Sequence, residues 1–319
     1  MTSPSDDALW DRSGHDPELA ELEGLLGVYA HRAPLRSPPA RPRRVWWMAG
    51  AGALLAVAAA IALVVVRPSS EREAAGFAVR LVSLDAGAAG GAGEASRLAV
   101  GDWLETSAEV RAEIAVADIG SITLSPDSRL RLVRTGPSEH RLELARGALS
   151  AKVDAPPRLF VVDVPGAAAV DLGCAYAMEV EPDGATHLLV TTGSVSLEGH
   201  GRAAWVPRGH EVWARPGGGP GLPLALGASP ALRAAAAALD RDGAAGAAEG
   251  VRAAGPGDAV TLWNLLARTA GATRLEVAAR LDQIAARPSW VLDDAVARGD
   301  AEALDGWRDA IEVRLSVRP

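Results

Sequence analysis

The sequence predicts a mainly β extracytoplasmic domain, with many short strands in a β-solenoid or sandwich-like arrangement, plus one transmembrane helix and a small C-terminal α-helical domain. Three observations support this fold class. An uncharged apolar run fills residues 45–66, short alternating runs separated by turn residues fill 77–214, and Ala-rich amphipathic segments fill 229–319. The Gly/Pro-rich segment 215–228 is expected to be a flexible linker between the last two.

Residues 1–44 are predicted to form a cytoplasmic tail with one short amphipathic helix, at about 17–30. Asp16 is a suitable N-cap, and Pro17 suits the first helical position. Apolar side chains then recur at spacings of three and four, which makes one stripe. A lone helix of this length is marginal in water, so we expect the stripe to dock on a cytoplasmic partner. A helix lying on the membrane surface and a mostly disordered tail are the alternatives. The expected partner-binding residues are Trp10, Leu19, Leu22, Leu25, Leu26 and Tyr29.

The apolar run at 45–66, VWWMAGAGALLAVAAAIALVVV, is long enough to cross a hydrocarbon core of about 30 Å as a helix. Residues 1–44 precede it, and it is too long for the apolar part of a signal peptide, so we expect an uncleaved span. Arginines cluster just before the run, which places the N-terminus in the cytoplasm and residues after 67 outside. The residues expected at the membrane interface are Arg41, Arg43, Arg44, Trp46 and Trp47.

The segment 77–214 is predicted to be an all-β domain. Runs such as RLRLV (129–133) and SVSLEG (194–199) alternate apolar and polar residues, and Gly, Pro, Asp and Ser separate them. Sandwich, barrel and β-solenoid remain open on this pattern.

Turn residues in this segment are expected to have structural roles only. Gly101–Asp102 and Pro182–Asp183–Gly184 read as tight turns, because Gly and Asp adopt backbone conformations that other residues resist. Gly147 and Gly193 each lie between strand-like runs and are expected to mark corners. The full set of expected structural-motif residues is Gly101, Asp102, Gly147, Gly173, Cys174, Asp183, Gly184 and Gly193.

The chain has one cysteine, Cys174, which excludes an intramolecular disulfide and a Cys-based zinc cluster. Gly173 before it favours a bulge. If strand alternation holds, Cys174 packs in the core as a small apolar side chain. A redox or signal-sensing thiol is the alternative. The residues expected to share its face are Val170, Leu172, Tyr176, Met178 and Val180.

The region 229–319 is predicted to form three or four short helices, whose role is protein contact or coverage of an edge of the β domain. Its core candidates are Leu262, Trp263, Leu265, Leu266, Leu275, Leu281, Ile284, Trp290, Leu292, Leu304, Trp307 and Ile311.

Composition and motifs do not indicate chemistry. The net charge of −8 offers no broad basic surface for nucleic acid. No catalytic, phosphate-binding or metal-binding motif is present, and His200 and His210 lack the spacing of a helical zinc site. We therefore expect no enzyme activity, no catalytic residue, no metal and no cofactor.

The order of the β-domain motifs resembles the FecR family of periplasmic signalling proteins. The residues that carry the resemblance are LAVGDWLETSAEVRAEIAVADIGSITLSPDSRL (98–130), RLELARGALSAKV (141–153), LFVVDVPGAAAVDLGCAYAMEVEPDGATHLLVTTGSVSLEG (159–199) and VPRGHEVWA (206–214). The resemblance implies a membrane-anchored regulator whose outer β domain receives a signal. It also implies that the cytoplasmic tail acts on a sigma factor of the extracytoplasmic-function type.

These expectations combine into a single-span protein of the bacterial inner membrane, with residues after 67 in the periplasm. It would couple its β domain to a cytoplasmic transcription partner, contact membrane lipid through the span and bind no nucleic acid. The alternative is a cell-envelope binding or scaffold module without direct sigma control. In that case the outer domains bind an unknown envelope protein or glycan.

Overall fold

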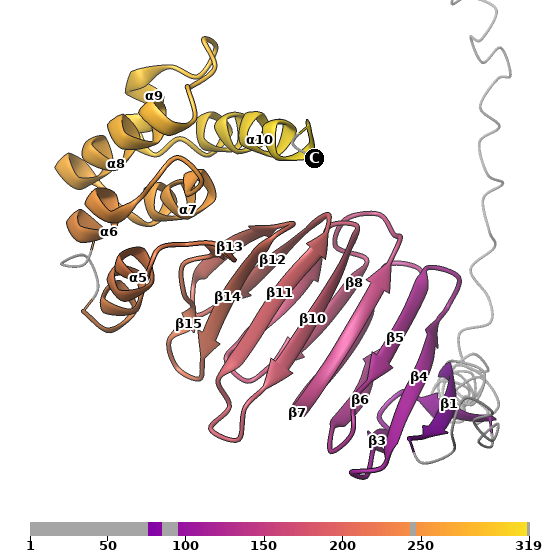
Figure 1. Ribbon diagram of the computed structural model, residues 1–319. Coiled ribbons are helices and arrows are strands. Elements are labelled where there is room, and N and C mark those ends of the chain that lie inside the picture. The colour runs from indigo at the N-terminus through magenta and orange to yellow at the C-terminus, as the bar shows by residue number, and fades with distance from the viewer. Residues whose placement is uncertain (1–75, 85–94, 243–246, 318–319) are drawn as a thin grey trace, which may run out of the picture. The chain divides into compact units, whose positions relative to one another are not determined.

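The computed structural model describes residues 76–84, 95–242 and 247–317 (Figure 1). All described residues belong to one compact unit, Val66–Pro319. The predicted tail helix and span, with the partner-binding and membrane-interface residues assigned to them, lie outside the described residues. Among the helices that are described, none combines the length and the apolar character that a membrane crossing needs.

Short strands dominate the first part of the described chain, as the alternating runs predict. They form two sheets. The first sheet contains β1, β2, β4, β5, β10, β11, β14, β15 and β16, the second contains β3, β6, β8, β9, β12 and β13, and β7 belongs to both. The strand bounds are β1 Gly76–Ser83, β2 Ala95–Ala99, β3 Trp103–Glu105, β4 Val110–Val116, β5 Gly120–Leu124, β6 Arg129–Arg134, β7 His140–Val153, β8 Phe160–Val164, β9 Ala167–Asp171, β10 Cys174–Val180, β11 Thr186–Thr192, β12 Ser194–Gly199, β13 Arg202–Pro207, β14 His210–Arg215, β15 Gly219–Pro220 and β16 Leu224–Ala225.

Strand β7 passes from one sheet to the other at Gly147. Its first half pairs with β6 and, in parallel, with β8, whereas its second half pairs with β5 and β10. Gly147 has φ +80°, and a Cβ there would overlap the Ser128 side chain. Only glycine fits both conditions, so this corner depends on it.

Two further crossings between the sheets lie at Gly173 and Gly193. The chain leaves the second sheet after β9 and enters the first at β10, passing Gly173 with φ +89°. It returns from β11 to β12 through Gly193, with φ +66°. The two corners touch, because a Cβ on Gly193 would overlap the carbonyl oxygen of Gly173.

The sheets share one apolar core, which makes the domain sandwich-like. In β10 every second residue is buried, from Cys174 through Tyr176 and Met178 to Val180, as period-two alternation predicts. Gly173 interrupts the alternation before Cys174. Val170, expected on the same face as Cys174, therefore lies on a strand of the other sheet.

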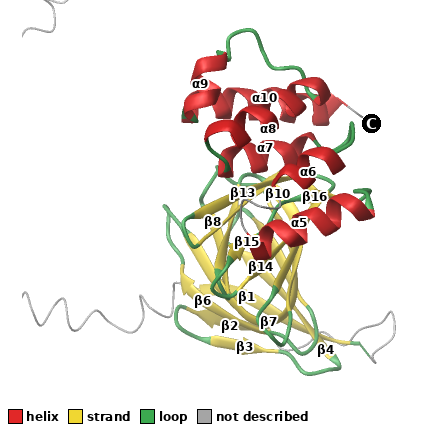
Figure 2. Cartoon of the chain, turned by 90° about the vertical axis from the view of Figure 1, so that its left-hand side faces the viewer, coloured by secondary structure: helices red, strands yellow, loops and turns green. Residues whose placement is uncertain are grey.

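The helices that follow pack with one another and form a second core (Figure 2). A mainly β domain with small C-terminal helices is thus confirmed. The helix bounds are α5 Pro230–Asp242, α6 Ala247–Ala253, α7 Ala259–Arg268, α8 Gly271–Ile284, α9 Asp293–Arg298 and α10 Ala301–Val317.

Three core candidates in this region were wrong. Leu275 is 53% exposed, because α8 turns Val277 and Leu281 inward instead. Trp290 and Leu292 are 73% and 60% exposed. They lie between α8 and α9, where helical spacing does not determine which side chains are buried.

The Gly/Pro-rich segment 215–228, expected to be a flexible linker, is held against the first sheet. Its strands β15 and β16 both pair with β14, and Gly221 N donates to Trp213 O at 2.7 Å. Because the strand pairing continues through this segment, the helices are joined to the β domain by ordered backbone.

Candidate functional site

A side chain of helix α7 supplies the missing hydrogen-bond partners at the edge of strand β13. Trp205 of β13 pairs with Ser196 of β12, and no described strand lies on the other side of β13. The backbone N–H and C=O of Trp205 that face this open side need other partners. Asn264 supplies them. Trp205 N donates to Asn264 Oδ1 at 2.9 Å, and Asn264 Nδ2 donates to Trp205 O at 3.0 Å. The amide of Asn264 thus takes the place of a neighbouring strand.

Further contacts fix the helices to the β domain. The ring of Trp205 packs edge-on against Trp263 with centroids 5.6 Å apart, and it belongs to the core of the helices. Thr261 Oγ1 donates to Pro223 O at 2.7 Å, and Arg233 of α5 pairs with Glu211 of β14 at 2.6 Å. The helices therefore cover the edge of β13, which would otherwise be open to unwanted strand pairing.

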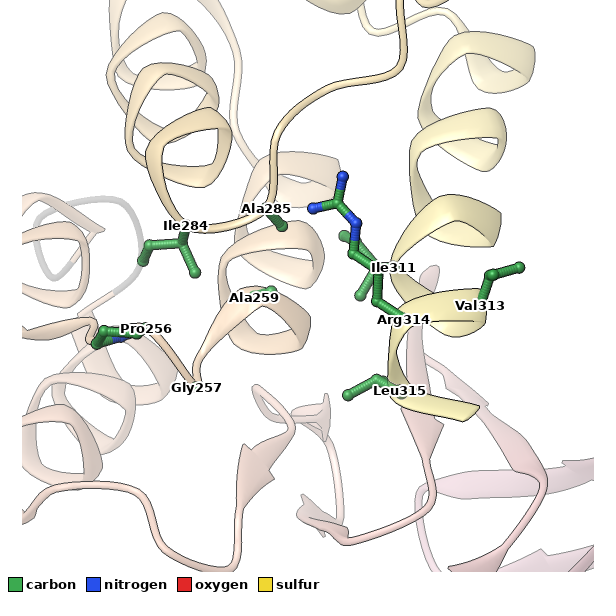
Figure 3. A pocket seen from close by; sticks show the side chains of 9 residues that line it. All are labelled: Pro256, Gly257, Ala259, Ile284, Ala285, Ile311, Val313, Arg314 and Leu315. Carbon is green, nitrogen blue, oxygen red and sulfur yellow. The ribbon is translucent and has the colours of Figure 1, made fainter. Parts of the chain in front are cut away.

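An apolar groove lies among the helices themselves. It has a volume of 380 Å³, and residues before and within α7, the end of α8 and the last turns of α10 line it (Figure 3). Val313 is 63% exposed at this site. Arg314 is the one charged residue among the described residues that line the groove. Its Nη2 donates to Ala286 O at 2.9 Å, which ties the guanidinium to the backbone just after α8. The groove can accept an apolar side chain of a partner.

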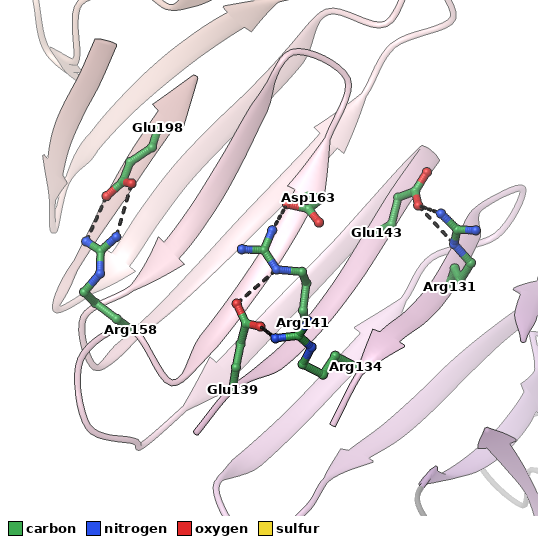
Figure 4. A network of polar contacts seen from close by, with 8 residues as sticks. All are labelled: Arg131, Arg134, Glu139, Arg141, Glu143, Arg158, Asp163 and Glu198. Carbon is green, nitrogen blue, oxygen red and sulfur yellow. Dashed lines mark hydrogen bonds and ion pairs between the residues drawn. The ribbon is translucent and has the colours of Figure 1, made fainter. Parts of the chain in front are cut away.

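A row of charges crosses the outer face of the second sheet (Figure 4). The strand register places Arg131, Glu143, Asp163 and Glu198 on one line, with Ala168 between the last two. These outward positions alternate with the buried core positions of the same strands.

Ion pairs connect the row to its neighbours. Arg131 Nε donates to Glu143 Oε2 at 3.0 Å, and Arg141 Nη1 donates to Asp163 Oδ1 at 2.6 Å. At the far end Arg158 Nη1 donates to Glu198 Oε1 at 3.0 Å. Partly exposed pairs of this kind add little to stability. A patterned charged face instead favours selectivity and orientation when a charged partner approaches.

An exposed aromatic residue ends this row. Trp103 of β3 is 37% exposed, and the guanidinium carbons of Arg129 and Arg131 lie 4.1 and 4.8 Å from its ring centroid. Cation–π attraction holds the ring in place. Strand β3 pairs only with β6, so this aromatic lies at an uncovered sheet edge among the described residues.

Cys174 lies in a buried polar contact inside the sandwich. Its thiol is 3% exposed and donates to Asp171 Oδ1, while Gly173 N donates to Asp171 Oδ2 at 2.9 Å. Burial raises the pKa of the Asp171 carboxyl above its usual range. Burial and the neighbouring Asp171 charge also raise the pKa of the Cys174 thiol strongly. A thiol with a raised pKa is a poor nucleophile and a poor sensor.

Cys174 is expected to resist thiol reagents in the native protein and to react fully after unfolding. Its burial blocks access, and its raised pKa removes the reactive thiolate. The reaction can be followed by mass spectrometry with a maleimide, because the chain has no second cysteine. Thr192→Cys, at an exposed position, is the control and should label at once at a single site. Fast labelling of the wild-type native protein would contradict this account.

The other predicted motif residues lie in turns. Gly101, with φ +97°, and Asp102 connect β2 to β3, and Asp102 N donates to Ala99 O at 3.1 Å. Between β10 and β11, Gly184 has φ +81°, and Asp183 Oδ1 accepts from Ala185 N at 2.8 Å. These residues are dispersed, so the structure does not bring the predicted set together into one site.

Sequence reasoning missed Asn264 and Asp171. A lone asparagine among apolar residues on helix α7 was a usable signal, because a buried amide needs partners. Asp171 had the weaker signal of a carboxyl two residues before a corner glycine. Within the described ranges, no group of three or more His, Cys, Asp or Glu side chains is arranged to hold a metal ion.

Comparison with known proteins supports the sequence resemblance. Residues 102–196 match the family described as FecR protein. Two crystal structures, both described as "a putative anti-sigma factor from Parabacteroides distasonis ATCC 8503", share 15% sequence identity with the chain and have TM-scores of 0.35. Each match covers 39% of this chain and 59% of that one, which is less than two thirds of its length. No curated protein matches the chain.

Proposed function

We propose that this chain, in which residues 102–196 match the FecR family, is a single-span signal transducer of the bacterial inner membrane. Its β domain receives a signal in the periplasm, and its N-terminal tail regulates a sigma factor of the extracytoplasmic-function type. The observation that carries the proposal is the FecR match, which lies on the C-terminal side of an uncharged apolar run at 45–66. Arginines before the run favour a cytoplasmic tail.

We assign contact with the sigma factor to the tail because its apolar stripe needs a partner that buries it. Leu19, Leu22 and Leu26 recur at spacings of three and four, as in helices that dock into an apolar groove of a partner. The apolar stripe is short, so the binding of the tail to a partner is helped when the adjoining span anchors the tail at the membrane. This gives the β domain a route to a transcription partner.

An enzyme function is not proposed. The one thiol in the chain is buried against Asp171, and burial with that charge raises its pKa. A nucleophilic cysteine needs the opposite environment, with a lowered pKa and an accessible sulfur.

Affinity capture with residues 1–44 as bait tests the output. The wild-type tail is expected to retain a sigma factor, and Leu22→Asp is expected to lose it, because the change places a charge in the apolar stripe. Glu23→Asp, at the next position, keeps the charge and is the matched control. Absence of any sigma factor from the wild-type capture would contradict the proposal.

An envelope binding or scaffold module is the second candidate. The charged row and Trp103 on the second sheet, with the apolar groove among the helices, favour it, since both offer surfaces to a partner outside the membrane. In this case residues 1–66 only anchor the protein.

A further inference from the structure

Two adjoining hollows meet where the second sheet joins the helices. One has a volume of 510 Å³ and lies between strands β12 and β13 and helices α7 and α10. The other, of 420 Å³, lies beside α5 and the junction of α7 with α8. Arg202 and Arg268 line both, so these two guanidinium groups mark the boundary between the hollows.

The larger hollow combines apolar and cationic walls. Trp205 and Trp263 provide its aromatic lining, and Arg202, Arg268 and Arg308 provide its charge. A volume of this size falls in the range of small-molecule sites, which join a mostly apolar wall to a few convergent polar groups.

One of the three arginines is already neutralised. Arg308 Nη1 lies 2.9 Å from Asp305 Oδ1, and its Nη2 lies 3.0 Å from Asp309 Oδ1. Its guanidinium carbon also lies 5.8 Å from the ring centroid of Trp263. Asp305 also lines this hollow and balances the charge of Arg308, and Asp309 places a further negative charge beside them.

The other two arginines have less compensation. Arg268 Nη2 donates to the carbonyl of Gly221 at 2.7 Å, and Arg202 Nη1 is 3.4 Å from the carbonyl of Gly218. The carboxylate that attracts Arg268 is Asp240, on the wall of the smaller hollow. Among the residues that line the two hollows, arginines therefore outnumber carboxylates by one.

Burial dominates the environment of Arg268, and the attraction of Asp240 outweighs the repulsion from Arg202. Burial lowers its pKa to about 10, and repulsion from Arg202 acts in the same direction while Asp240 opposes it. Its Nε is buried and has no hydrogen-bond partner among the described residues. Buried donors are almost always satisfied, so the guanidinium of Arg268 is incompletely satisfied by the described residues.

We propose that the larger hollow binds a small organic molecule that carries one carboxylate or phosphate group, with Arg202 and Arg268 at its anionic end. The oxyanion accepts from the guanidinium groups, which favour such ligands through paired, charge-assisted hydrogen bonds. The body of the molecule lies against Trp205 and Trp263. Such a ligand joins β13 to α7 and α10, so it stiffens the contact between the β domain and the helices. The site stands whether or not the tail controls a sigma factor.

Matched hexose probes test this site on the purified full-length chain. Glucuronate, glucose 6-phosphate and glucose share one ring and differ in the anionic group, so isothermal titration separates carboxylate and phosphate recognition. At least one anionic sugar is expected to bind saturably, and glucose is expected to bind at least tenfold more weakly. Stronger binding of glucuronate assigns the carboxylate, and stronger binding of glucose 6-phosphate assigns the phosphate.

Arg202→Gln is the test variant, because Arg202 is exposed and its described hydrogen bond is a long one to Gly218 O. Losing one charge-assisted partner should weaken binding of the anionic sugar about tenfold. Arg215→Gln, at an exposed arginine that lines neither hollow, is the control and should bind as the wild type does. The proposal fails if neither anionic sugar binds, if glucose binds equally well, or if Arg202→Gln and Arg215→Gln behave alike.

Discussion

Gly193→Ala is expected to destabilise the chain by about 4 kcal/mol or more, a loss comparable with the whole stability of many domains. Gly193 has φ +66°, and its added Cβ would overlap the carbonyl oxygen of Gly173. Both residues lie on corners where the chain crosses between the two sheets. The added Cβ would meet backbone atoms, which cannot move aside as a flexible side chain can. The overlap is therefore removed only if the two corners move apart. Urea denaturation followed by tryptophan fluorescence measures the loss.

Gly217→Ala is the matched control for this corner. Gly217 also has a positive φ, of +75°, but a Cβ there meets nothing within 4 Å. Its substitution carries only the conformational cost, about 1–2 kcal/mol. If both variants lose the same stability, the close approach of Gly193 and Gly173 is not what fixes the corner.

Asn264→Leu is expected to cost about 2–5 kcal/mol, because it leaves the N–H and C=O of Trp205 without partners in a buried position. Leucine is close in size to asparagine and suits a helix, so cavity and propensity effects are small. The loss should be measurable as a lower urea midpoint for the full chain. It should also expose the edge of β13, with more rapid hydrogen exchange at the Trp205 amide.

Gln283→Leu makes the same kind of amide-to-leucine change at an exposed position of α8. Surface changes of this kind stay within about 0.5 kcal/mol. A similar, small effect of Asn264→Leu would mean that the helices do not depend on this amide to hold the edge of β13.

Local patterns were sufficient for much of the fold. The alternation in β10 predicted that Tyr176, Met178 and Val180 are buried, because successive strand residues face opposite sides. The apolar spacing in α7 predicted that Leu262 and Leu266 are buried. It did not predict the exposure of Trp290, which lies outside a helix where spacing has no meaning.

Long-range contacts were beyond the reach of sequence patterns. Asn264 pairs with a residue 59 positions earlier, and the pairing depends on Trp205 lying on an edge strand. Sequence spacing also gave no sign that Arg202 and Arg268 line the same hollow. Arg202 lies on β13 and Arg268 on α7, and only the packing of these two elements brings them together. The ordered segment 215–228 was misjudged for the same reason, as its pairing with β14 outweighs the flexibility of its glycines.

The central claim is that the tail carries a signal to transcription, and removing that tail tests it most directly. Deletion of residues 1–40 keeps the arginines next to the apolar run, so the span retains its predicted orientation. We predict that the deletion changes the transcripts of a sigma-dependent gene set while the protein stays at its normal level in the membrane. An unchanged transcript profile, with every envelope phenotype of the intact protein retained, would contradict the transducer and leave the scaffold.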